Sequence, residues 1–146
     1  MMGPRGRRRR GASWLGSVFL VAAVLNFVWE MAQAYLYQPM GPIWEAIRRC
    51  LTASIVDGAM VLLVLATVRS LVSRSAASIA GREYALTIVF GIALAVALEW
   101  LGLTSGRWTY RAEMPTVIGV GLVPILQMAV LMPLTLWLTD RFPVER

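Results

Sequence analysis

Four polar side chains near the N-terminus have the spacing of a single helix face. They are Asn26, Glu30, Gln33 and Tyr37, at positions i, i+4, i+7 and i+11. The first three lie in an apolar run over residues 14–36 that is long enough to cross a membrane. A carboxyl group in such a run is costly and normally faces a bundle interior or a wet cavity, so Glu30 is a candidate functional residue.

Two further carboxyl groups lie inside apolar runs. Asp57 comes soon after the start of a run over residues 51–71, and Glu99 comes just before the end of a run over residues 84–103. If successive runs cross the membrane in opposite directions, all three carboxyl groups lie roughly 6–9 Å below the same boundary, at ~1.5 Å of helix rise per residue. Like charges that close in a low dielectric do not all stay ionised, and a protonated carboxyl beside an ionised one suits general acid and base chemistry.

Other polar and aromatic residues are expected around this layer as binding residues. Asn26 and Gln127 are predicted deeper in the bundle, with Gln33 and Tyr37 above the carboxyl groups. The aromatic candidates are Trp29, Trp100, Trp108 and Tyr110, and Arg107 is the candidate that tunes the charge, with Arg48, Arg49 and Arg111 as further ion-pair partners. Two alternatives remain: the aromatic residues serve as interface anchors, and the polar residues hydrogen-bond across helices without any chemistry.

Composition indicates an integral membrane protein of one domain. The chain of 146 residues is 58% hydrophobic and 15% charged, with a mean hydropathy of +0.66. Histidine and lysine are absent and Cys50 is the single cysteine, which excludes histidine bases, Schiff-base lysines and an intramolecular disulfide. We therefore predict no metal site and no cofactor.

The predicted fold is all-α, a four-helix up-and-down transmembrane bundle over residues 14–140. Its spans cover about residues 14–36, 51–71, 84–103 and 115–138. A basic disordered arm over residues 1–13 precedes it, and a polar tail over residues 141–146 follows. A break at residues 38–42 and a short interfacial helix over residues 43–49 separate the first two spans. An outer loop over residues 104–114 leads to Pro115 in the first turn of the fourth span, where Gly119 and Gly121 are expected to allow close helix packing.

The arginines predict the orientation. With four spans, ten of the fourteen fall on the side of both termini and four on the other, so both termini are expected in the cytoplasm of a cell with the chain in its inner (plasma) membrane. The basic patch is interpreted as this topology signal, and nucleic-acid binding is not expected. A signal peptide cleaved near the Ala32-Gln33-Ala34 sequence is the alternative for the first span.

Two resemblances follow from the motifs. Asn26-Phe-Val-Trp29-Glu30-Met, Ala53-Ser54 with Asp57, Glu99-Trp100, Gly106-Arg-Trp-Thr-Tyr110, Met114-Pro115 and Pro124-Ile-Leu-Gln127-Met together resemble a family of small, uncharacterised bacterial membrane proteins. Locally, Asn26-x-x-Trp29-Glu30 resembles a motif of integral-membrane terpene cyclases, in which a glutamate is thought to help protonate an isoprenoid. That resemblance implies Glu30 as the acid and Glu99 or Asp57 as its partner, although the motif covers five residues and those enzymes have about seven spans.

Three classes of function are compatible with these patterns. The first is an enzyme or binder of a membrane lipid, an isoprenoid or another apolar small molecule, in which Glu30, Asp57 and Glu99 carry the chemistry. The second is a proton-linked small transporter or channel subunit. The third is a structural or assembly subunit of a membrane complex, and a homo-oligomer is compatible with each class.

Overall fold

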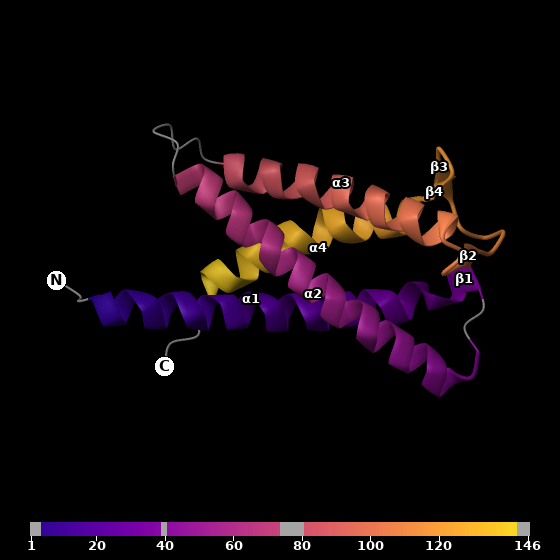
Figure 1. Cartoon of the computed structure of the whole chain (residues 1–146), viewed down its shortest axis with the longest axis horizontal. Coiled ribbons are helices and arrows are strands. Elements are labelled where there is room, and N and C mark those ends of the chain that lie inside the picture. The colour runs from indigo at the N-terminus through magenta and orange to yellow at the C-terminus, as the bar shows by residue number, and fades with distance from the viewer. Residues whose placement is uncertain (1–3, 39–40, 74–80, 143–146) are drawn as a thin grey trace.

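The computed structural model describes residues 4–38, 41–73 and 81–142. Within these ranges the chain forms four long helices, α1 (Pro4–Gln33), α2 (Ile43–Ser73), α3 (Arg82–Thr104) and α4 (Leu122–Arg141) (Figure 1). Each contains a stretch long and apolar enough to cross a membrane. In lipid a helix satisfies its backbone hydrogen bonds within one segment, which explains why these apolar runs are helical. The prediction of four helices that are each long and apolar enough to cross a membrane is confirmed.

The helices pack most closely in two pairs, α1 on α2 and α3 on α4, and α1 also contacts α4. The apolar core between them consists of Val18, Ala22, Val61, Leu65, Ala95, Met128, Met132 and Leu136. Gly58 of α2 brings the two backbones close, because a Cβ there would lie 3.3 Å from the carbonyl oxygen of Phe19 on α1. Small residues commonly permit such approaches between helices in membranes.

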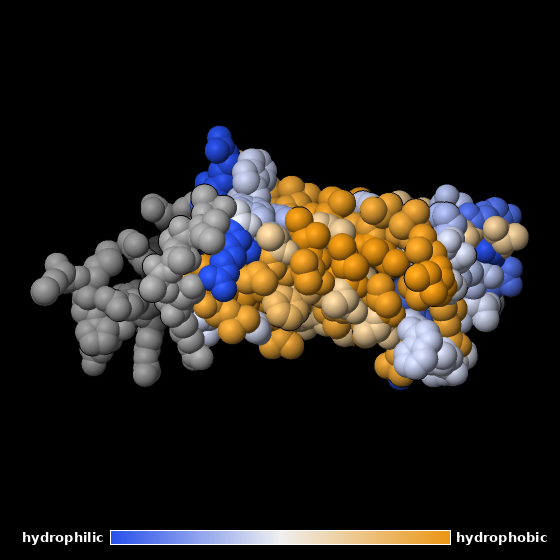
Figure 2. All heavy atoms as spheres, turned by 90° about the horizontal axis from the view of Figure 1, so that it is seen from above, coloured by the Kyte–Doolittle hydropathy of each residue, from blue (hydrophilic) through white to orange (hydrophobic). Residues whose placement is uncertain are grey.

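The outer surface carries a broad apolar band. In the view of Figure 2, hydrophobic side chains cover the middle of the molecule and hydrophilic ones gather toward the ends that are coloured. Large side chains such as Leu20, Leu63 and Val89 are more than 60% exposed. Monomeric soluble proteins rarely expose so much contiguous apolar surface, and this distribution suits lipid contact.

Helix α2 corrects one prediction about the connection between the first two spans. The structure has a single helix from Ile43, so the separate interfacial helix over residues 43–49 is wrong, and the span does not begin at residue 51. No proline or glycine occurs between Ile43 and Gly58, so nothing in the local sequence interrupts the helix. The helix therefore presents its first two turns to the same site as its middle.

The start of α4 corrects another prediction. Residues 115–121 are not helical: β3 (Thr116–Val117) pairs antiparallel with β4 (Val120–Gly121), and α4 begins at Leu122. The turn uses Ile118 and Gly119 with φ of 53° and 78°, the positive values that a two-residue type I′ hairpin requires. Gly119 thus serves the turn and not helix packing as predicted.

The N-terminal arm also differs from expectation. Helix α1 begins at Pro4, so residues 4–13 are helical, whereas residues 1–13 were predicted to be disordered. Proline is favoured in the first turn of a helix and arginine is a good helix former, so this basic segment can form the first turns of α1. Residues 1–3, most of the predicted polar tail and the connector at 74–80 lie outside the described residues.

Short backbone pairings tie the loops together at one end of the helices, which we call the cavity end. There β1 (Tyr37–Gln38) pairs antiparallel with β2 (Thr109–Tyr110), and the Arg111 N–H donates to the Leu36 carbonyl at 2.9 Å (Figure 1). The predicted break after the first span and the predicted outer loop are therefore one paired unit. This pairing holds the loop after α3 over the end of α1.

A single arginine joins the helices at the opposite end, which we call the latch end. Arg69 of α2 donates through Nε to Glu83 of α3 at 2.9 Å and through Nη2 to Asp140 of α4. Its guanidinium also lies 4.2 Å from the ring centroid of Trp14 on α1. All four helices thus meet around one cation.

Candidate functional site

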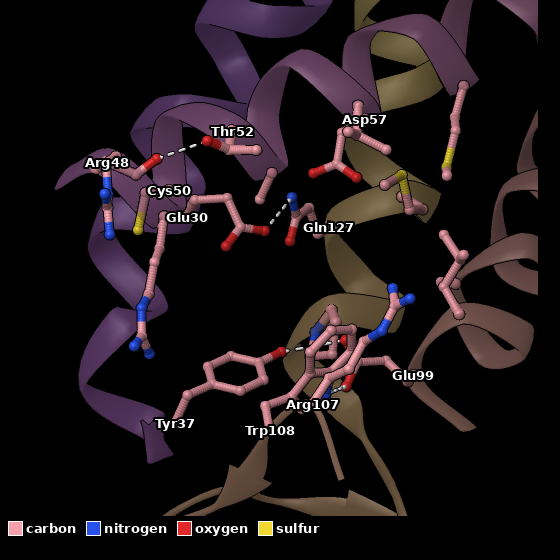
Figure 3. Close-up of a pocket in the computed structure, with 18 of the residues that line it drawn as sticks. Glu30, Tyr37, Arg48, Cys50, Thr52, Asp57, Glu99, Arg107, Trp108 and Gln127 are labelled. Carbon is pink, nitrogen blue, oxygen red and sulfur yellow. Dashed lines mark hydrogen bonds between the residues drawn. The ribbon is translucent and has the colours of Figure 1, made fainter. Parts of the chain in front are cut away.

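A cavity of about 970 Å³ lies toward the cavity end (Figure 3). Its walls include Glu30 of α1, Asp57 of α2, Glu99 of α3 and Gln127 of α4. Apolar side chains form much of the remaining wall: Ala53, Val56, Met60, Ala95, Leu98, Pro124 and Met128. The three carboxyl groups predicted to share one depth therefore line the same cavity, and each comes from a different helix.

Buried amides hold Glu30 in place. Its Oε1 accepts hydrogen bonds from Gln33 Nε2 at 3.0 Å and from Gln127 Nε2 at 3.1 Å. Gln127 Nε2 also donates to Asn26 Oδ1 at 2.8 Å, and Gln33 Nε2 donates to Gln127 Oε1 at 2.8 Å. Because Asn26, Gln33 and Gln127 are all at most 3% exposed, this network fixes the Glu30 side chain against α4.

The predicted common helix face does not decide which of these residues reach the cavity, and α1 ends at Gln33, so Tyr37 reaches the cavity from β1 and not from that face. Gln127 lines the cavity, whereas Asn26 and Gln33 lie behind Glu30 and do not. Trp29 also lies outside the lining and donates from Nε1 to Gln33 Oε1 at 3.2 Å. The structure therefore makes Asn26, Trp29 and Gln33 positioning residues for Glu30 and not parts of the cavity wall.

Glu99 accepts hydrogen bonds from three aromatic side chains. Tyr37 donates to Oε1 at 3.3 Å, Trp108 Nε1 donates to Oε2 at 3.3 Å, and the Tyr110 hydroxyl donates to Oε2. Burial, followed by the nearby Glu99 charge, raises the pKa of Tyr37 above its ordinary value. Burial and the hydrogen bond to Glu99 raise the pKa of Tyr110 in the same way, so both hydroxyls remain donors.

Packing holds these aromatic rings around Glu99, and Tyr37 and Trp108 line the cavity whereas Tyr110 does not. The Tyr37 ring meets the rings of Tyr110 and Trp108 edge to face, with centroids 5.6 and 6.5 Å apart. Trp108 lies against Gly102 of α3, where an added Cβ would fall 1.9 Å from the ring atom Cζ2. The Gly121 N–H donates to the Tyr110 hydroxyl at 2.9 Å, so the β3–β4 hairpin supports the same cluster.

Asp57 differs from the other two carboxyl groups. Figure 3 shows its carboxylate directed into the cavity, on the side where Gln127 lies. Among the described residues it forms neither a hydrogen bond nor an ion pair, although it is only partly exposed. Asp57 is therefore a cavity carboxyl group without a hydrogen-bond or ion-pair partner in the described part of the chain.

The arginines do not behave as predicted. Arg48, Arg49 and Arg107 line the cavity, but across the described ranges neither Arg48 nor Arg107 forms an ion pair with the three carboxyl groups. Arg111 is exposed and lies outside the lining. The expected neutralisation of the carboxyl layer by Arg107 or Arg111 is therefore absent there.

The structure does not bring Trp100 to the site. Its side chain is 65% exposed, and it is not part of the cavity wall. Successive residues of a helix point about 100° apart, so a Glu99 that faces inward turns Trp100 toward the outside. Trp100 fits the alternative of an anchor on the apolar surface.

Sequence reasoning missed the wall formed by the first turns of α2. Cys50, Thr52 and Ala53 line the cavity together with Asp57, and Cys50 is buried. Cys50, Ala53, Asp57 and Met60 have the spacing i, i+3, i+7 and i+10, which marks one helix face. Because the predicted span began at residue 51, the prediction did not include Cys50 on this helix face.

Within the described residues, no group of three or more cysteine, aspartate or glutamate side chains is placed to hold a metal ion. No protein-family model matches the chain, and no curated protein and no solved structure matches it either. The chemistry of the site therefore rests on its geometry: a largely apolar cavity with carboxyl groups from three helices that are long and apolar enough to cross a membrane.

Proposed function

We propose that this chain is an inner-membrane protein that binds a lipid or isoprenoid in the cavity and acts on it by proton transfer. The observation that carries the proposal is that Glu30, Asp57 and Glu99, from three helices, line one cavity whose walls are otherwise largely apolar. Small-molecule sites typically combine an apolar lining with a few convergent polar groups. Ionisable residues at membrane depth normally mark such functional sites.

Hydrogen bonding supports different roles for the carboxyl groups. Glu30 and Glu99 accept hydrogen bonds from amide, hydroxyl and indole donors, and such donors favour the ionised form that a base requires. Asp57 has no partner among the described residues and is free to donate a proton. Asp57 is therefore our proton donor, in place of the Glu30 that the cyclase resemblance implies.

The proposed reaction adds one proton to the ligand and removes another. Asp57 transfers its proton to a carbon of a carbon–carbon double bond, and the π-electron pair forms the new C–H bond. Glu30 then takes a proton from a carbon adjacent to the resulting cation, whose C–H electrons restore a double bond. The product is an isomer of the ligand, and the faces of Tyr37 and Trp108 stabilise the cation between the two steps.

The membrane arrangement belongs to the same proposal. We infer an up-and-down bundle with both termini in the cytoplasm, because ten of the fourteen arginines then lie on the cytoplasmic side. The cavity end then faces the outer leaflet. Ligand access from that leaflet is compatible with an apolar wall that includes Val56 and Leu98.

The half of the bundle toward the latch end supports this function over proton-linked transport. Its interior is filled by apolar side chains such as Leu65, Met132 and Leu136. The buried hydroxyls of Thr87 and Thr135 donate to carbonyls of their own helices, at 2.7 Å each. A proton path from the carboxyl layer would need polar groups that bridge the helices here.

Deuterium incorporation tests the proposed chemistry. The purified protein in mild detergent is incubated with geranylgeraniol in D₂O, and the deuterium content of the recovered isoprenoid is measured by mass spectrometry. We expect deuterium to enter the isoprenoid with the wild-type protein and with Glu113→Gln, a change at an exposed loop carboxylate outside the cavity. Asp57→Asn and Glu30→Gln should incorporate at the rate without protein; incorporation by Asp57→Asn at the wild-type rate would refute its role.

A further inference from the structure

Two arginines at the cavity end have no part in the proton-transfer scheme. Arg48 belongs to α2, Arg107 to the loop after α3, and both side chains line the cavity (Figure 3). Neither forms an ion pair with a carboxylate in the described part of the chain. The cavity therefore has cationic groups on two walls that pair with no carboxylate of the described residues.

The depth of these arginines separates them from Asp57. Arg48 precedes Asp57 by nine residues on one helix, so it lies about 13 Å nearer the cavity end at ~1.5 Å of rise per residue. Arg107 follows Thr104, the last residue of α3, and so also lies at that end. Toward the middle of the bundle the wall becomes apolar, with Met60, Ala95 and Met128.

This order of groups matches an amphipathic ligand with a negative headgroup. Guanidinium groups bind phosphate oxygens through paired N–H donors, so each of these two arginines can bind a phosphate at the cavity end. Glu30 and Glu99 already accept hydrogen bonds from amide, hydroxyl and indole donors, which reduces their repulsion of an anion at the mouth. A cavity of about 970 Å³ has room for a phosphate and several isoprene units.

We infer that the ligand is a phosphorylated amphiphile whose phosphate binds at the cavity end, at Arg48 or Arg107, and whose apolar chain extends past Asp57 toward Met60 and Met128. This inference rests on the proposed function for the location of the ligand. It adds the headgroup class and the two arginines that can recognise it. The phosphate itself takes no part in proton transfer and remains bound through it.

The test compares ligands that differ only in the phosphate. Binding of geranylgeranyl phosphate, geranylgeraniol and inorganic phosphate to the full-length protein in detergent is followed by the quenching of tryptophan fluorescence and by native mass spectrometry. We expect geranylgeranyl phosphate to bind at least about tenfold more tightly than geranylgeraniol, since each charge-assisted hydrogen bond contributes substantially. Inorganic phosphate should not compete at millimolar concentration.

Arginine variants assign the preference to particular side chains. The double variant Arg48→Gln with Arg107→Gln should bind both isoprenoids equally and remain folded by circular dichroism. Arg111→Gln is the matched control, because Arg111 lies on the same loop as Arg107, is exposed and does not line the cavity. An unchanged preference in the double variant, or its equal loss in Arg111→Gln, would overturn the inference.

Other outcomes separate this inference from the proposed function. If the two isoprenoids bind equally to the wild-type protein and deuterium still enters geranylgeraniol, the headgroup inference fails and the proton-transfer function stands. If geranylgeranyl phosphate binds preferentially but no deuterium enters either isoprenoid, the headgroup inference stands and the proton-transfer function fails. Competition by inorganic phosphate alone would show a site for the free anion and would contradict a lipid headgroup.

Discussion

The cavity end and the latch end use the same charged residue types in opposite ways. At the latch end Arg69 donates to Glu83 and Asp140 and lies over the Trp14 ring, so its guanidinium group connects all four helices. At the cavity end Arg48 and Arg107 form no ion pair with the carboxyl groups that share their cavity. Charges that pair within the chain stabilise its packing, whereas charges left without a partner remain available to a ligand.

The polar groups between the two ends sharpen this contrast. Glu30 and Glu99 are held by donors, yet both still line the cavity. Asp57, on the same wall as Arg48, is held by none within the described residues. A partly buried charged group without a hydrogen-bond or ion-pair partner lowers the stability of the folded protein, and such groups are typical of functional sites.

The largest effect is expected from Gln127→Leu, which would remove the support of the cavity end. Gln127 is 2% exposed and bonds Asn26, Glu30 and Gln33, so its loss leaves two buried groups and the partly buried Glu30 short of a partner. We expect the free energy of unfolding to fall by about 2–4 kcal/mol. Thermal unfolding in detergent measures it, and Leu126→Ala, at an exposed neighbour, is the control. Equal stability of Gln127→Leu and wild type would show that this network does not hold the site.

The next largest effect is expected at the roof of the cavity. Gly102→Ala would place a Cβ 1.9 Å from the Trp108 ring, so the ring must move and Glu99 loses a donor. We expect destabilisation of about 1–3 kcal/mol, the usual cost of overpacking, together with a changed tryptophan emission spectrum. Gly16→Ala, where nothing lies within 4 Å, should leave both properties unchanged. If Gly102→Ala changes neither the stability nor the emission spectrum, the Trp108 ring does not lie against Gly102.

A smaller effect is expected at the latch end. Arg69→Gln removes two ion pairs and a cation–π contact. The side chains of Arg69, Glu83 and Asp140 are, however, 28–42% exposed to solvent. We therefore expect a loss of only about 1–2 kcal/mol in the free energy of unfolding. A double-mutant cycle with Glu83→Gln measures the pairwise part. Additive losses would mean that the two residues are not coupled and that packing alone closes this end.

The smallest effect on stability is expected for Asp57→Asn. Asp57 has no hydrogen bond or ion pair in the described chain to lose, so the free energy of unfolding should stay within about 0.5 kcal/mol of wild type. Asp140→Asn at the latch end, which loses its bond to Arg69, should destabilise more. The order of the two melting temperatures in the same detergent tests the comparison directly. A larger loss for Asp57→Asn would mean that Asp57 supports the fold.

Much of the fold could be predicted because lipid leaves few options for a long apolar run. Four such runs, with polar breaks between them, predict the four helices. The ends were predicted less well. Local signals were compatible with two structures at two places: a break or a continuous helix over residues 43–51, and a helix or the short β3–β4 hairpin after Pro115.

For the site, the sequence by itself predicted a common depth for Glu30, Asp57 and Glu99, because helix rise converts residue number into position along each helix, and it left their facing open. Only the tertiary structure turned all three toward one cavity. Only the tertiary structure decided the partners: amides behind Glu30, aromatic donors around Glu99, and none for Asp57 within the described chain. It also decided that Arg48 and Arg107 face the cavity without a carboxylate partner. The physical reason is that periodicity acts within one helix, whereas hydrogen-bond partners depend on how the four helices rotate and tilt against one another.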